Sequence, residues 1–140
     1  MTEESAGRSA PVGGPELLAC TCAHLADERK AEQIVVLNVG RLTFFTDYFV
    51  IATGRNERQI KAIADDMRTR MQALGQPVIG IEGQPEAGWV LIDLGDVIVH
   101  LFNPDTRLIY DLELLWGEAP RGQWQTVQPM APPAGPEPLV

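Results

Sequence analysis

Residues 89–102 read WVLIDLGDVIVHLF, and this stretch decides the fold. Two apolar runs flank Leu94-Gly95, which predicts two antiparallel strands joined by a two-residue turn. In that register three pairs face each other: Trp89 and His100, Leu91 and Ile98, and Asp93 and Asp96. Like charges placed directly opposite cost about a few tenths of a kcal/mol, so the acidic pair at the turn is mildly unfavourable.

Around this hairpin the chain supplies further strands and helices. β-Branched and aromatic runs predict strands at 34–39, 48–53 and 78–81. Helical patterns predict helices at 15–30, 56–74 and 112–116, with loop at 83–88 and a turn at Pro104-Asp105. Asn56 and Gln59 are placed to cap the long helix, Gly75 to end it, and Asp111 to cap the last one. These elements predict an α/β (α+β) fold, a mixed β-sheet of about five strands packed with helices.

The two ends of the 140-residue chain differ from its middle in composition. Residues 1–14 are small and polar, which predicts a mobile N-terminal arm. Six of the eleven prolines fall in residues 120–138, so 118–140 is predicted to be a Pro-rich tail that is disordered or loosely draped. The predicted folded domain is therefore 15–117, a usual size for one small domain.

Charge and cysteine usage restrict the class of protein. The net charge is −8, from 11 basic and 19 acidic residues. Phosphate binding depends on Lys and Arg, so direct sequence-specific nucleic-acid binding is disfavoured and a basic partner is favoured. No apolar run approaches the roughly 20 residues that cross a bilayer, so no membrane partner is expected. Cys20 and Cys22 cannot form a disulfide framework, which favours a cytoplasmic location.

Acidic residues and aromatic rings gather in one part of the chain. Residues 82–118 contain eight acidic residues and one basic residue. Large aromatic side chains are mostly buried, which favours the core for Phe102 and Trp116. Trp89 and Tyr110 can expose a polar edge, so core and interface are equally open for them. Aromatic residues in an acidic surround are typical of a surface that binds a basic partner.

Three patterns suggest chemistry, and each has an ordinary structural explanation that we favour. Cys20 and His24 share a helical face, but two ligands fall short of the four that zinc takes. Gly54 joins a strand to a helix, where anion sites form, although glycine is routine at such turns. Asp93 and Asp96 are spaced wrongly for a nucleotidyl-transfer magnesium site. A metal-binding module and a nucleotide-binding enzyme stay open as alternatives.

Three segments, in order, resemble the signatures of the ribosomal silencing factor (RsfS, Iojap-like) family. The first is DYFVIATG at 47–54, followed by RQ at 58–59 and AIAD at 62–65. The second is WVLIDLGDVIVH at 89–100. The third is Arg107 with YDLE at 110–113 and LW at 115–116. Asn56 stands where the family commonly has serine, and the Pro-rich tail lies outside the motifs.

The resemblance implies a fold related to the nucleotidyltransferases that lacks their catalytic acids. It therefore implies a protein that is not an enzyme and has no cofactor. It implies binding to the large ribosomal subunit through ribosomal protein fourteen, which would sterically block the small subunit and repress translation under nutrient limitation. Relatives in organelles are linked to large-subunit assembly, which is the alternative role, and the family permits a homodimer.

The family's partner-contact positions match Trp89 and Tyr110, so we expect these two rings to supply buried contact. We expect Asp111 and Glu113 to face basic groups of the partner. Arg107 would support these two acids, and His100, in an apolar strand, is assigned to the core or the interface. The predicted partner-binding set is Trp89, His100, Arg107, Tyr110, Asp111 and Glu113.

Overall fold

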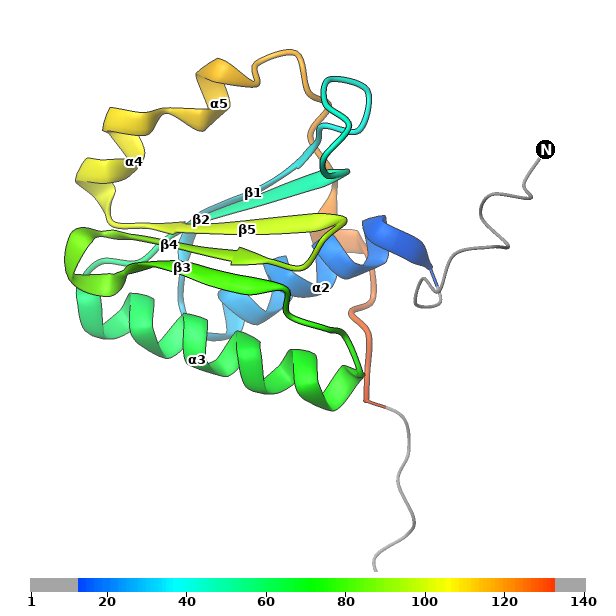
Figure 1. Ribbon diagram of the computed structural model, residues 1–140, viewed down its shortest axis with the longest axis horizontal. Helices are drawn as coiled ribbons and strands as arrows, with labels where there is room; N and C mark the ends of the chain where they lie inside the picture. The colour runs from blue at the N-terminus through cyan, green and yellow to red at the C-terminus, as the bar shows by residue number, and fades with distance from the viewer. Residues whose placement is uncertain (1–12, 133–140) are drawn as a thin grey trace, which may run out of the picture.

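The computed structural model describes residues 13–132 and builds them around one mixed sheet. Within these residues the sheet has five strands in the order β1-β2-β5-β4-β3 (Figure 1). Neighbouring strands are antiparallel, except that β2 and β5 are parallel. The strands are β1 (Glu32–Asn38), β2 (Tyr48–Thr53), β3 (Gly80–Gln84), β4 (Trp89–Asp93) and β5 (Val97–Phe102). The helices are α2 (Gly14–Glu28), α3 (Glu57–Leu74), α4 (Pro104–Tyr110) and α5 (Leu112–Leu115). The predicted fold class is confirmed.

The two faces of the sheet are covered unequally. The long helices α2 and α3 lie over one face, and the shorter α4 and α5 lie over part of the other (Figure 1). The main core lies between the sheet and the long helices, and includes Val50, Val99 and Met67. A smaller cluster around Phe49 and Phe102 lies on the other face. Both faces are apolar, but only one has long helices over it.

The β4–β5 hairpin forms as predicted, but its register differs by two residues. The observed pairs are Trp89 with Phe102, Leu91 with His100 and Asp93 with Ile98. All three predicted pairs are therefore wrong: Trp89 with His100, Leu91 with Ile98, and Asp93 with Asp96. Because the side-chain period of a strand is two, this even shift leaves each residue on its predicted face. Trp89 and His100 still share a face as diagonal neighbours.

The geometry of the turn explains the register. Leu94 donates its backbone N–H to the Val97 carbonyl at 2.9 Å, so Gly95 and Asp96 are the central turn residues. Gly95 has a φ of 90°, which the first central position of a type II′ turn requires. The Asp93 carboxylate accepts the Gly95 N–H at 2.8 Å. In the observed register Asp93 therefore has a hydrogen-bond donor for its carboxylate and does not stand opposite Asp96.

Local signals place α3 where the sequence predicts it. The Asn56 side chain accepts the backbone N–H of Gln59 at 2.9 Å, and Gly75 ends the helix with a φ of 74°. The Gln59 side chain accepts the backbone N–H of Arg55 at 2.7 Å and donates to the Arg29 carbonyl at 3.0 Å. One side chain thus joins the start of α3 to the end of α2.

Helix α2 is buried on more sides than its sequence predicts. Both Cys20 and Cys22 are buried, and burial raises the pKa of the Cys22 thiol to about 12. His24 lies with its Nε2 atom 2.7 Å from the Val127 carbonyl oxygen. Cys20 and His24 therefore do not form an exposed pair of ligands. Within residues 13–132, no group of three or more His, Cys, Asp or Glu could hold a metal ion.

Strand β3 covers 80–84, so the predicted strand at 78–81 and loop at 83–88 are displaced. β3 is an edge strand that is largely exposed and is held by its ladder with β4. Such a strand has no burial pattern from which the sequence could locate it. Gly83 has a φ of 89°, and a Cβ atom there would clash with the Trp89 carbonyl oxygen.

Helix α4 replaces the turn predicted at Pro104-Asp105. Asn103 caps it, because its side chain accepts the Thr106 backbone N–H at 2.8 Å. Pro104 occupies the first turn, where a missing N–H does no harm. The Asn103-Pro104 pair is a typical helix start that could have predicted α4 from the sequence. The helix was missed because several of its apolar residues are exposed, so its sequence lacks the single apolar face that marks an amphipathic helix.

Residues 118–132, which belong to the tail predicted to be disordered or loosely draped, lie against the sheet and α2. Gly122 donates its N–H to the Val36 carbonyl at 2.8 Å, beside β1. Trp124 is 7% exposed and packs edge-on against His24, with ring centroids 5.1 Å apart. These contacts join residues that are far apart in the chain, so local composition could not predict them.

The described residues leave parts of the predicted ends untested. Residues 133–140 of the predicted tail and residues 1–12 of the predicted arm lie outside them. Helix α2 already begins at Gly14, the last residue assigned to the arm. Between residues 13 and 132, no helix combines the length and the apolar character needed to span a bilayer.

We expect Trp124→Ala to lower the free energy of unfolding by about 3 kcal/mol, because it removes a buried ring and leaves a cavity against α2. Urea unfolding of the full chain measures this change. The control is Gln125→Ala, an exposed position in the same turn, for which we expect a change within about 0.5 kcal/mol. Equal stability of the two variants would show that residues 118–132 do not stabilise the fold.

Candidate functional site

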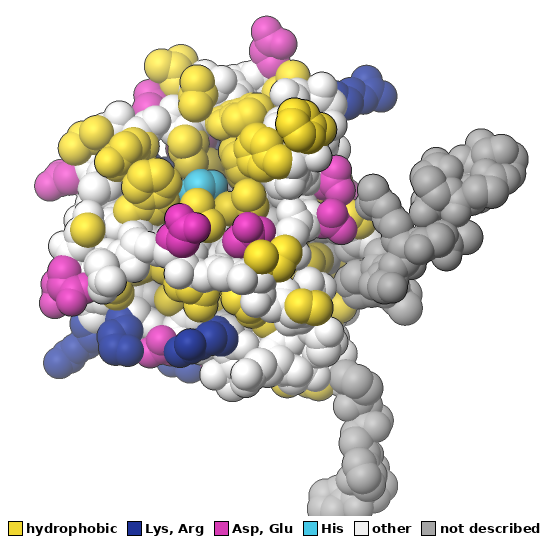
Figure 2. Space-filling view, in the orientation of Figure 1, with side chains coloured by type: hydrophobic (Ala, Val, Ile, Leu, Met, Phe, Trp, Pro, Cys, Tyr) yellow, Lys and Arg dark blue, Asp and Glu magenta, His cyan; other side chains and the backbone are white. Residues whose placement is uncertain are grey.

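Part of the sheet is uncovered on the side of α4 and α5. On β4 and β5 the residues that face α2 and α3 are buried, whereas Trp89, Leu91 and Ile98 on the opposite side are half-buried. Tyr110, at the end of α4, is exposed and lies beside Trp89. We call Trp89, Leu91, Ile98 and Tyr110 the open face. Figure 2 shows apolar side chains gathered on this side of the molecule.

Trp89 is the centre of the open face. Its ring centroid lies 4.5 Å from that of Tyr110 and 5.3 Å from that of Phe102. Its Nε1–H donates to Nδ1 of His100 at 3.3 Å. A cavity of about 310 Å³ opens beside the indole, and its lining residues are Glu82, Gly83, Ala87, Trp89, Leu91 and Tyr110. The indole is therefore held from several sides while part of its surface stays accessible.

His100 lies beneath the open face and is not part of its surface. Only 5% of the residue is exposed. Burial lowers the pKa of the imidazole to about 4, so the ring is neutral near pH 7. The structure therefore places His100, a member of the predicted partner-binding set, beneath Trp89 and almost entirely out of contact with solvent.

Acidic side chains border the open face. Glu82 stands opposite Leu91 on the neighbouring strand, so both project to the same side of the sheet. Asp93 ends β4, and Asp96 lies in the following turn. Figure 2 shows acidic side chains next to the apolar surface, whereas the Lys and Arg side chains gather toward α3. The border of the open face therefore favours a basic partner.

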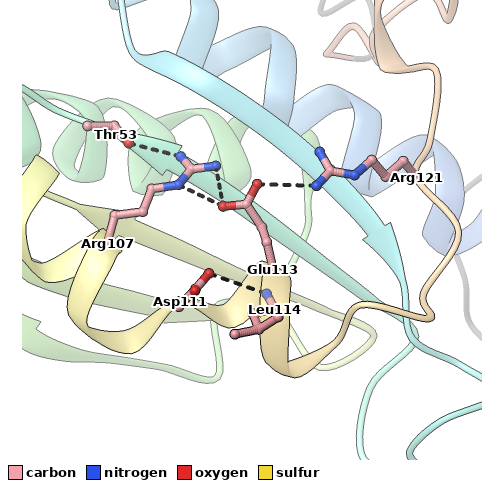
Figure 3. Close-up of polar contacts among 6 residues, drawn as sticks. All are labelled: Thr53, Arg107, Asp111, Glu113, Leu114 and Arg121. Atoms are coloured by element: carbon pink, nitrogen blue, oxygen red, sulfur yellow. Dashed lines mark hydrogen bonds and ion pairs between the residues drawn. The ribbon is translucent and has the colours of Figure 1, made fainter.

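Arg107 ties the α4–α5 segment to the sheet (Figure 3). Its guanidinium is buried and donates to the Thr53 hydroxyl at 2.9 Å and to Glu113 Oε1 at 3.0 Å. The other carboxylate oxygen of Glu113 accepts from Arg121 at 3.4 Å. These contacts connect β2, α4, α5 and the C-terminal segment. Because α4 carries Tyr110, they also hold one wall of the open face.

Asp111 and Glu113 have partners within the chain. Asp111 has a φ of 41° between α4 and α5, and its carboxylate accepts the Leu114 N–H at 3.3 Å (Figure 3). Glu113 is shared by Arg107 and Arg121. The expected support of Glu113 by Arg107 is present. That Asp111 and Glu113 face basic groups of a partner stays a prediction, and carboxylates on β3 and in the β4–β5 turn also lie beside the open face.

An exposed apolar rim beside the open face was missed by the sequence analysis. Four aliphatic side chains on α4 and α5 are between 71% and 79% exposed: Leu108, Ile109, Leu114 and Leu115. Phe44 and Phe45, before β2, are exposed as well. Contiguous exposed apolar surface is typical of interaction sites. The adjacent apolar pairs Leu108-Ile109 and Leu114-Leu115 could have predicted this rim if residues 104–110 had been recognised as a helix.

The alternative sites are occupied by structural contacts. Gly54 donates its N–H to the Phe102 carbonyl at 2.8 Å, so this amide does not point at a free anion site. A Cβ atom at Gly54 would lie 2.7 Å from a side-chain carbon of Ile60, which explains the glycine by packing. Asp93 holds the hairpin turn. None of these groups forms a pocket for phosphate or metal within the described residues.

Comparisons with known proteins point to one family. The family profile described as "Ribosomal silencing factor during starvation" matches residues 14–137. "Ribosomal silencing factor RsfS" of Halalkalibacterium halodurans is 47% identical over 94 residues, which is 67% of this chain and 80% of that protein. "Mitochondrial assembly of ribosomal large subunit protein 1" of Mus musculus is 34% identical over 95 residues, covering 66% of this chain and 42% of that protein. A crystal structure from Chromobacterium violaceum matches with a TM-score of 0.69 and 30% identity, over 86% of this chain and 92% of that one.

We expect the free energy of unfolding to fall between about pH 7.5 and about pH 5.5 by on the order of 1 kcal/mol through His100 alone. The unfolded chain protonates this residue near its ordinary pKa of 6.5, but the folded chain does so only near 4, so acid favours the unfolded state. Urea unfolding at both pH values measures this pH dependence. His100→Phe should reduce it, and an unchanged pH dependence in His100→Phe contradicts the assignment.

We expect Glu113→Gln to lower the free energy of unfolding by about 2 kcal/mol, because it leaves the buried Arg107 guanidinium without its carboxylate. The matched control is Glu118→Gln at an exposed position, with an expected change within about 0.5 kcal/mol. Thermal or urea unfolding distinguishes the two. If both variants match the parent chain, the Arg107–Glu113 pair does not hold the α4–α5 segment.

Proposed function

Because the chain belongs to the family of ribosomal silencing factors, we propose that it binds the large ribosomal subunit through its open face and thereby blocks association with the small subunit in the cytoplasm. The partner on the subunit would be ribosomal protein fourteen, as the family resemblance implies. The outcome would be repression of translation under nutrient limitation. The observation that carries this proposal is the open face itself, a rigid aromatic surface left uncovered on a folded chain.

The chemistry of the open face suits a protein partner with basic side chains. Trp and Tyr are the residue types that most often dominate binding energy at interfaces. Trp89 and Tyr110 lie in contact here, and the exposed rim on α4 and α5 extends the apolar area. Glu82 and Asp96 border that area and would steer a basic surface toward it.

Occlusion requires only tight binding at the right place. A bound chain of 140 residues excludes a second large body from the surface that it covers. No bond is made or broken in such a mechanism, so no nucleophile, metal or cofactor is needed. We therefore propose a regulatory role without catalysis, and the protein would act in stoichiometric amounts with ribosomal particles.

A second candidate function is assistance in assembly of the large subunit. The mouse relative is named for that role, and it is 34% identical over 95 residues. The same face could bind the same ribosomal protein on an immature particle. Silencing requires binding to the mature large subunit, whereas assembly requires binding to an immature particle. The particle that the chain captures from a lysate therefore distinguishes the two roles. A second copy of this chain is a further candidate for binding the open face. In that case dilution would dissociate the homodimer and expose the face.

We expect Trp89→Ala and Tyr110→Ala each to weaken binding to purified large subunits by at least about 2 kcal/mol, because each removes a ring from the centre of the proposed contact. Co-sedimentation at graded concentrations measures the affinity. Lys61→Ala, on the exposed side of α3, is the control and should bind as the parent chain does. Co-sedimentation of both ring variants at parental affinity would contradict the proposed site.

The proposed action has its own test. Mixing purified large and small subunits with an excess of the chain should reduce formation of the joined ribosome, followed by light scattering. The Trp89→Ala variant should not reduce it. Unchanged joining with the parent chain would refute silencing by occlusion, and capture of immature large particles from a lysate would then favour the assembly role.

A further inference from the structure

We propose that His100 is a positioning residue, a neutral hydrogen-bond acceptor that fixes the orientation of the Trp89 indole in the open face. The proposal rests on the proposed function only for its consequence in binding. Its structural part concerns the free protein and can be tested without ribosomes. It gives a role to a buried polar group that neither the fold nor the contact surface explains.

The hydrogen bond between the two residues determines which nitrogen of His100 carries the proton. The indole Nε1–H is a donor only. It lies 3.3 Å from Nδ1 of His100, so Nδ1 must accept and cannot itself be protonated. In a neutral imidazole the proton is then on Nε2. The hydrogen bond from Trp89 therefore requires the tautomer of His100 that carries its proton on Nε2, and protonation of Nδ1 would remove the acceptor.

The other side of the ring is also occupied. Strand β5, which carries His100, lies between β4 and β2. On the β2 side the Phe49 ring packs against the imidazole, with ring centroids 5.0 Å apart and an interplanar angle of 85°. Nε2 is buried and has no hydrogen-bond partner among the described residues. Edge-to-face ring contacts of this kind are favourable, so Phe49 helps to hold the imidazole in place.

Packing leaves the imidazole little freedom to rotate. Phe102 lies parallel to it, with an interplanar angle of 8° and centroids 6.0 Å apart. Trp89 in turn lies between Tyr110 and Phe102. Without the acceptor on His100, the indole N–H would be left unpaired in a partly buried place, which favours rotation of the ring toward water. The orientation of the central ring of the open face thus depends on one acceptor atom below it.

Two nuclear magnetic resonance measurements on the free protein test the structural part. In the parent chain labelled at histidine, we expect Nδ1 of His100 to show the shift of an unprotonated nitrogen and Nε2 that of a protonated one. The indole N–H signal of Trp89, assigned from its loss in Trp89→Phe, should exchange slowly with solvent. Because the first measurement uses the parent chain, it does not depend on a variant that folds.

Two substitutions separate the acceptor from the shape of the ring. His100→Phe keeps a flat ring but has no acceptor, so the Trp89 indole signal should move and exchange faster. His100→Gln retains an acceptor, and its indole signal should stay nearer to the parent's. Affinity for large subunits should fall about fivefold in His100→Phe, the ratio for loss of one ordinary hydrogen bond, and less in His100→Gln.

The outcomes are distinguishable. A protonated Nδ1 in the parent chain overturns the proposal, and so does an indole signal that is unchanged in His100→Phe. If His100→Phe shows the expected indole changes but the parent chain binds no ribosomal particle, the positioning role is supported and the proposed function is refuted. Equal affinity of His100→Phe and the parent chain, with a displaced indole signal, overturns the claim that this orientation matters for binding.

Discussion

The sheet has two apolar faces, and the chain provides long helices for only one of them. Helices α2 and α3 bury one face, but α4 and α5 are too short to cover the other (Figure 1). Burial of apolar area stabilises a fold by roughly 25 cal/mol per Å², so the uncovered residues forgo that stabilisation. Trp89, Leu91 and Ile98 are left at a surface on which another molecule can complete the burial.

An uncovered apolar surface is useful for binding only if it is rigid before the partner arrives. Arg107 joins β2 to α5 through Thr53 and Glu113, and so holds the helix that carries Tyr110. From below, His100 occupies the space between Trp89 and Phe49. Residues ordered in advance lose less conformational freedom on association, which leaves more of the contact energy for affinity.

Family membership and charge agree with this physical account. The proposed silencing by occlusion needs a surface that binds tightly and a body that excludes a second particle. The acidic border of the open face and the net charge of −8 both favour a basic partner. Neither Gly54 nor Asp93 is free for chemistry, because each holds a turn or a packing contact. The contacts of these residues are in keeping with the proposed binding role.

The sequence by itself determined the features that depend on local signals. Asn56 and Gly75 located α3, the apolar run at 48–53 located β2, and the ordered motifs identified the family. It also singled out Trp89 and Tyr110, whose contact the structure shows, although their role in binding stays a proposal. Only the tertiary structure decided the hairpin register, the edge strand β3, the docking of residues 118–132 and the partners of Arg107 and Glu113. Each of these features depends on turn geometry or on contacts between residues that are far apart in the sequence. Arg107 and Thr53, for example, form a hydrogen bond although 54 positions separate them. A local sequence pattern contains no information about such a pairing.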